Sequence, residues 1–98
     1  MSEVESIVAM LPTGHDNAMT RQKLVASSGI NDRKVRELLE QARDAGFLIC
    51  NDQDGRGYYI AKDDDEVERQ YRRDYARAIS VLKRLKPFRR HLKNCGRL

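Results

Sequence analysis

The stretch of residues 20–39, TRQKLVASSGINDRKVRELL, is the feature that most restricts the possible fold, because it predicts two short amphipathic helices joined through a glycine turn. Thr20 is a good N-cap, since its hydroxyl can accept a hydrogen bond from a free amide of the first turn. Leu24 and Val25 give that helix a buried face. Gly29 can adopt the left-handed conformation that ends it.

The second helix of the pair follows at once. Ile30 is an apolar residue at the corner, and Asn31 is a second N-cap. The apolar residues after it recur at i, i+3, i+4 and i+7, namely Val35, Leu38, Leu39 and Ala42. This spacing predicts a helix with one buried stripe and a solvent-exposed opposite face.

The register of Val25, Gly29 and Val35 resembles the helix-turn-helix pattern of bacterial and phage DNA-binding proteins. That pattern has a small residue, a glycine four residues later, and an aliphatic residue six beyond the glycine. The chain departs from it at Val25, where the family usually has alanine because the two helices touch there. The resemblance implies that the second helix is a recognition helix for DNA.

The flanking segments supply the remaining parts of a larger motif. A helix over residues 2–11 opens with a capping box of Ser2 and Glu5. Residues 47–50 and 58–60 predict two strands, and the turn-rich residues 51–57 lie between them. Residues 18–19 can add a third short strand.

We therefore expect an α+β, mostly α fold, a winged helix-turn-helix of three helices and a two- or three-stranded wing, followed by a long C-terminal helix. The predicted winged-helix domain covers residues 1–61 and is similar to the small DNA-binding domains of the biotin-repressor and sugar-operon-repressor type. The remaining residues, 62–98, form the basic C-terminal helix with a frayed basic end.

The C-terminal helix is expected to begin at a capping box of Asp63 and Glu66. Pro87 ends or kinks it, because proline cannot donate the helical hydrogen bond. One side carries apolar residues at coiled-coil spacing, which we interpret as a homodimer interface: Tyr71, Tyr75, Ala78, Ile79, Leu82 and Leu85. Packing of this helix back on the body is the alternative.

Charge divides the chain into two parts. Residues 1–66 hold 8 Lys/Arg and 13 Asp/Glu, a net charge of −5, whereas residues 67–98 hold 11 and 2, a net charge of +9. The winged-helix body can therefore approach phosphate only if its cations gather on one face. The basic end can act as a nucleic-acid arm or as a docking patch for an acidic surface.

The cations of the body do fall where a winged helix contacts DNA. An arginine can bind guanine and an asparagine can bind adenine in the major groove, and free amides at a helix start favour phosphate. Arg36 and Arg43 suit backbone or structural contacts. The candidate DNA-binding residues are Thr20, Arg21, Lys23, Asn31, Arg33, Lys34, Arg36, Glu37 and, at the wing tip, Arg56.

No nucleophile and base occur together in a catalytic pattern, so we expect no enzyme activity, no cofactor and no metal site. No small-molecule ligand and no membrane partner are evident. Two cysteines and no signal peptide fit a cytoplasmic protein. The leading hypothesis is a small phage or bacterial transcriptional regulator that binds double-stranded DNA as a homodimer. The alternative is a non-enzymatic interaction or replication adaptor whose basic helix docks an acidic partner.

Overall fold

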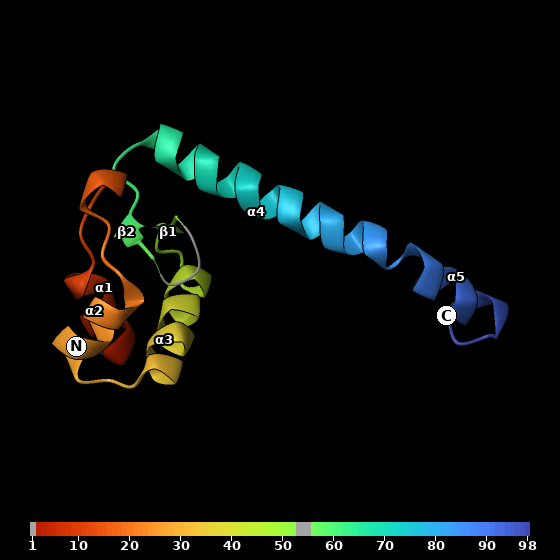
Figure 1. Cartoon of the computed structure of the whole chain (residues 1–98), viewed down its shortest axis with the longest axis horizontal. Helices are drawn as coiled ribbons and strands as arrows, with labels where there is room; N and C mark the ends of the chain where they lie inside the picture. The colour runs from red at the N-terminus through yellow and green to blue at the C-terminus, as the bar shows by residue number, and fades with distance from the viewer. Residues whose placement is uncertain (1, 53–55) are drawn as a thin grey trace. The chain divides into compact units, whose positions relative to one another are not determined.

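The computed structural model describes residues 2–52 and 56–98 and divides into two compact units, the first ending at Glu68 and the second running from Arg69 to Leu98. The first unit is the mostly helical α+β arrangement predicted (Figure 1). Its elements are α1 (Glu3–Met10), a 3₁₀ turn η1 (His15–Asn17), α2 (Arg21–Ser28), α3 (Asp32–Asp44), β1 (Ile49–Asn51) and β2 (Tyr58–Ile60).

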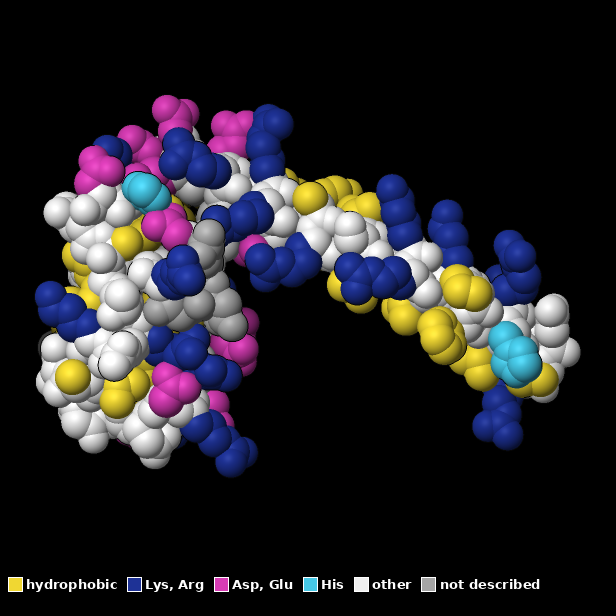
Figure 2. Space-filling model, viewed as in Figure 1, with side chains coloured by type: hydrophobic (Ala, Val, Ile, Leu, Met, Phe, Trp, Pro, Cys, Tyr) yellow, Lys and Arg dark blue, Asp and Glu magenta, His cyan; other side chains and the backbone are white. Residues whose placement is uncertain are grey.

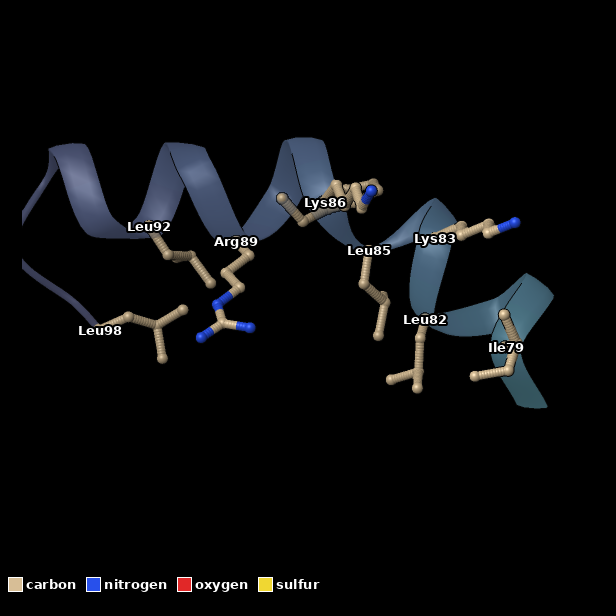
Figure 3. Close-up of a pocket in the computed structure, with 9 residues that line it drawn as sticks. Ile79, Leu82, Lys83, Leu85, Lys86, Arg89, Leu92 and Leu98 are labelled. Carbon is tan, nitrogen blue, oxygen red and sulfur yellow. The ribbon is translucent and has the colours of Figure 1, made fainter. Parts of the chain in front are cut away.

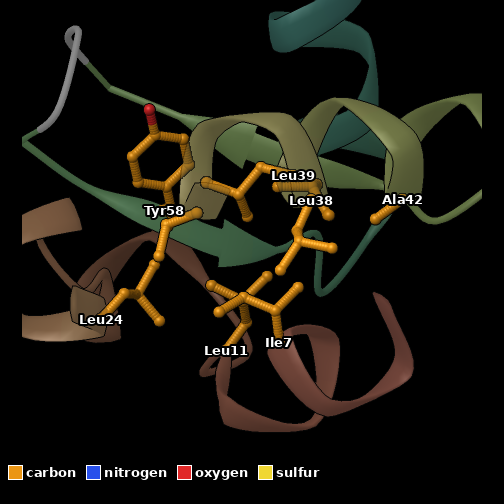
Figure 4. Packing of buried hydrophobic residues seen from close by; sticks show 9 residues of the cluster. Ile7, Leu11, Leu24, Leu38, Leu39, Ala42 and Tyr58 are labelled. Atoms are coloured by element: carbon orange, nitrogen blue, oxygen red, sulfur yellow. The ribbon is translucent and has the colours of Figure 1, made fainter. Parts of the chain in front are cut away.

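The core of this unit forms around α3. Its predicted apolar stripe is confirmed, since Val35, Leu38, Leu39 and Ala42 are all buried. In Figure 4, Ile7 and Leu11 point toward this stripe from the segment of α1, and Leu24 comes from α2. Burying such aliphatic side chains contributes about 1.5 to 3 kcal/mol each. The three helices therefore close over one core whose centre is α3.

Local capping sets the turn between α2 and α3, as predicted. The amide of Lys23 donates to Oγ1 of Thr20 at 3.1 Å, and the amide of Lys34 donates to Oδ1 of Asn31 at 2.9 Å. Gly29 has φ of 73°, and its amide donates to the carbonyl of Val25 at 3.0 Å. Glycine adopts this left-handed conformation without the steric cost of a Cβ, so the chain turns sharply between the helices.

Two antiparallel strands form the wing, with Cys50 opposite Tyr59. The predicted third short strand is reduced to an isolated bridge, in which Met19 and Tyr58 exchange backbone hydrogen bonds of 2.9 and 2.8 Å beside the two-stranded sheet. The turn expected over residues 51–57 includes residues 53–55, which lie outside the described part of the chain. Three helices followed by this hairpin have the order of a winged helix.

The first strand is shorter than predicted. It begins at Ile49 rather than at residue 47, and Phe47 and Leu48 are exposed. The reason is the end of α3, where Gly46 has φ of 102° and the amide of Phe47 donates back to the carbonyl of Ala42 at 3.1 Å. This helix-terminating motif uses the residues that the apolar pattern had assigned to the strand.

Two helices form the rest of the chain. The helix α4 (Asp64–Arg84) begins in the first unit and continues into the second, where α5 (Lys86–Asn94) follows. The interruption near Lys86 is confirmed. Most of the end expected to be frayed, up to Asn94, is instead helical, because Pro87 lies in the first turn of α5, where its missing amide breaks no helical hydrogen bond.

A buried carboxylate fixes the start of α4. Glu66 is only 4% exposed, and its two oxygens accept the amides of His15 and Lys62, both at 2.9 Å. The predicted capping box is half correct. Asp63 accepts the amide of Glu66 at 3.0 Å, but Glu66 reaches past Asp63 to the preceding amide and to η1. One side chain thus joins three segments of the first unit.

We predict that Glu66→Ala lowers the free energy of unfolding by about 2 to 4 kcal/mol, because two backbone amides lose their acceptor in a buried position. Urea denaturation followed by circular dichroism measures this loss. The matched control is Asp65→Ala in the same helical turn, where the side chain is exposed. Equal destabilisation by the two variants would contradict a structural role for the Glu66 carboxylate.

Candidate nucleic-acid interface

Arg21 joins the three elements that a winged helix uses to contact DNA. Its Nε donates to Oδ1 of Asp32 at 2.6 Å, which ties the start of α2 to the start of α3. Hydrogen bonding to Asp32, and then to Tyr58 of β2, raises the pKa of Arg21 above its ordinary value. The side chain is 16% exposed. This arginine is therefore a charged link between α2, α3 and the wing.

Asp32 also pairs with a second arginine. Its Oδ2 lies 3.2 Å from Nε of Arg36, one helical turn along α3. One carboxylate is thus shared by Arg21 and Arg36, which leaves a net positive charge at this place. A guanidinium has five N–H donors, so the exposed Arg36 can donate to a phosphate as well as to Asp32. Both arginines belong to the predicted set, but the central role of Asp32 was not predicted.

The side-chain charge on the solvent-exposed face of α3 changes from positive to negative along the helix. Arg33 is 91% exposed and lies 3.5 Å from Glu37 between Nε and Oε1. Glu40 and Asp44 follow on the same side, opposite the buried stripe. On this face the cation Arg33 therefore lies in the first turn, and carboxylates follow it. The part of this face that matches the negative potential of a DNA groove is confined to the start of α3.

The two capping residues have a local role already. The side-chain oxygens of Thr20 and Asn31 accept amides within their own helices, at 3.1 and 2.9 Å. An asparagine that binds adenine uses its oxygen as acceptor and its Nδ2 as donor. Asn31 can make that contact only if its oxygen accepts a second hydrogen bond.

The other predicted cations divide between exposed and structural positions. Lys23 in the first turn of α2 and Arg56 beside the wing are exposed, and Lys34 is partly exposed. Arg43 has the structural role expected of it. Its Nε donates to the carbonyl of Ile49 at 3.1 Å and its Nη2 donates to Asn51 at 3.2 Å. This arginine therefore connects the end of α3 to β1.

The predicted dimer residues form an exposed stripe on the second unit. Tyr71, Tyr75, Leu82 and Leu85 are each about half exposed or more, and the rings of Tyr71 and Tyr75 lie 5.8 Å apart. Ala78 and Ile79 belong to the same side by helical spacing. Figure 2 shows yellow apolar side chains along α4 and α5 with blue cations beside them. Large exposed apolar stripes of this kind mark interaction surfaces.

Neither a metal-binding group nor a membrane-spanning helix is seen in the described residues. Across residues 2–52 and 56–98, no group of three or more His, Cys, Asp or Glu side chains is placed to hold a metal ion. Within the same ranges, no helix is both long enough and apolar enough to cross a membrane. Among the described residues, the cation cluster at the start of α3 and the apolar stripe of the second unit are the surfaces considered for binding.

No protein-family model, curated protein or solved structure matches the chain. The arrangement of α1 to α3 with the hairpin is winged-helix-like, and this likeness rests on the order and pairing of its own elements.

Proposed function

We propose that the chain binds double-stranded DNA in a sequence-specific way, with the N-terminal half of α3 in the major groove. Arg33 and Lys34 would contact base edges, and Glu37 can accept from cytosine. The residues at the start of α2 would contact phosphates, together with Arg36 and the wing residue Arg56.

The observation that carries this proposal is the link through Arg21. The start of α2, the start of α3 and β2 meet at this side chain, through Asp32 at 2.6 Å and through Tyr58. A winged helix presents these same three parts to a duplex. Exposed cations lie next to the link in the sequence, at Lys23 and Arg33.

A homodimer formed through the second unit would increase the affinity. Two linked recognition helices engage paired half-sites, and the second contact is then effectively intramolecular. The exposed stripe from Tyr71 to Leu85 has the spacing of a two-heptad seam. A cytoplasmic transcriptional regulator of phage or bacterial type is the role that fits a small DNA-binding dimer.

We predict that Arg33→Ala weakens binding to the preferred duplex by about 1 to 3 kcal/mol and relaxes the choice of one base pair. In contrast, Lys23→Ala should weaken every duplex alike, because a phosphate contact carries no sequence information. The measurement is selection from a random duplex library, followed by fluorescence anisotropy with the selected and scrambled duplexes.

Lys62→Ala is the matched control, since it removes one exposed charge beside the acidic residues 63–65. Binding of that variant should equal binding of the unaltered chain. An absence of duplex binding at low salt would refute the proposed function, and so would identical effects of all three substitutions.

We predict that Leu82→Asp converts the dimer to a monomer, because a carboxylate in an apolar seam loses its hydration. Light scattering over a concentration series gives the mass. Ala76→Asp introduces the same charge at an exposed position on the opposite side of α4 and should leave the mass unchanged. A monomeric unaltered chain would contradict the proposed dimer while leaving DNA binding open to its own test.

A further inference from the structure

The junction of α4 and α5 forms a groove in the second unit. Six apolar side chains and three basic ones line it, namely Ile79, Leu82, Leu85, Phe88, Leu92, Leu98, Lys83, Lys86 and Arg89. In Figure 3, the side chains of Leu82, Leu85 and Leu92 point to the same side of the two helices. Phe88 is 67% exposed and Leu82 is 60% exposed, so residues of this unit do not cover the groove.

The end of α5 shapes the groove. Gly96 has φ of 76°, and the amide of Arg97 donates to the carbonyl of Leu92 at 2.8 Å. This is the hydrogen bond of a helix-terminating Schellman turn, which reverses the chain. Leu98 is thereby brought below Leu92 and forms one end of the groove (Figure 3). The surface is concave, as a site for an inserted helix requires.

The charged side chains that line the groove are all basic. Residues 75–98 contain eight Lys/Arg and no Asp or Glu. Arg89 lies on the same side as the leucines, between Leu85 and Leu92 in Figure 3. A guanidinium between two leucines favours a carboxylate partner when a bound helix covers it, because a charge-assisted hydrogen bond is strong where water is displaced.

A second copy of α5 does not provide that carboxylate. Residues 86–98 contain five Lys/Arg and no Asp or Glu, so pairing α5 with a second α5 would bring like charges together without a counter-charge. An anionic membrane is also a poor match. An amphipathic helix that binds lipid buries its apolar face in the interface, and here that face contains Arg89 in a concave surface.

We propose that this groove binds an acidic amphipathic helix of another protein, whose apolar side chains occupy the leucine-lined floor and whose carboxylate pairs with Arg89. The interaction is separate from DNA binding by α3 and does not depend on it. Ile79, Leu82 and Leu85 belong to both the groove and the proposed dimer seam, so an acidic helix bound there would compete with the pairing of two chains. The chain would then connect a DNA site to a protein partner.

The test uses the full chain and a fluorescein-labelled helical peptide of about 18 residues, with leucines at i, i+3, i+4 and i+7 and glutamates elsewhere. A second peptide has glutamine in place of every glutamate. Fluorescence anisotropy should show at least about tenfold tighter binding of the acidic peptide at 0.1 M salt, since the charged pairs are lost in the other.

Two neighbouring substitutions distinguish binding in the groove from nonspecific attraction of the peptide to the basic segment. Arg89→Glu should weaken binding of the acidic peptide at least about tenfold, whereas Arg90→Glu, the same change one residue along on α5 and outside the groove, should weaken it less than about threefold. Both residues are exposed, so both variants should keep the helical circular dichroism of the unaltered chain.

Equal losses from Arg89→Glu and Arg90→Glu would overturn the proposal, as would equal affinity for the two peptides. A competition experiment adds vesicles of phosphatidylserine and phosphatidylcholine to the peptide complex. If the vesicles bind the chain and displace the acidic peptide, the proposal is overturned in favour of a lipid surface. Duplex binding measured on the same variants reports on the function of α3 separately.

Discussion

Burial of the apolar stripe of α3 is the constraint on which the first unit depends. Val35, Leu38, Leu39 and Ala42 are covered by side chains of α1, α2 and the hairpin. This contact sets the rotation of α3 about its own axis, because the stripe occupies one side of the helix. The residues on the opposite side of α3, between Arg33 and Asp44, are therefore exposed to solvent. The candidate nucleic-acid surface is thus a consequence of how the core packs.

Most of the fold could be predicted because its signals are local. Thr20, Gly29 and Asn31 act within their own turns, and the stripe of α3 repeats within thirteen residues. Such signals require no knowledge of distant partners. The same is true of the exposed apolar residues of α4, whose spacing follows from the helix alone. The positions of the candidate site residues on their elements were predictable for this reason.

The features that sequence reasoning missed depend on distant or competing partners. Glu66 is bonded to the amide of His15, which lies 51 residues away, and Asp32 is bonded to Arg21 across the turn. Nothing in the local pattern distinguishes these carboxylates from the solvated ones beside them. An apolar run favours a strand, and this predicted a strand at Phe47. Its amide instead donates to the carbonyl of Ala42 at the glycine-terminated end of α3. The ordered α5 likewise depends on how Pro87 is placed in its first turn.

The sharing of Asp32 by Arg21 and Arg36 has a consequence for how the proposed DNA-binding surface would search a genome. Cations that already hold a carboxylate attract phosphates less strongly, so this part of the surface would release few counterions and add little affinity for random DNA. At the start of α3, the discrimination between a specific site and the rest of the genome would then come mainly from base contacts.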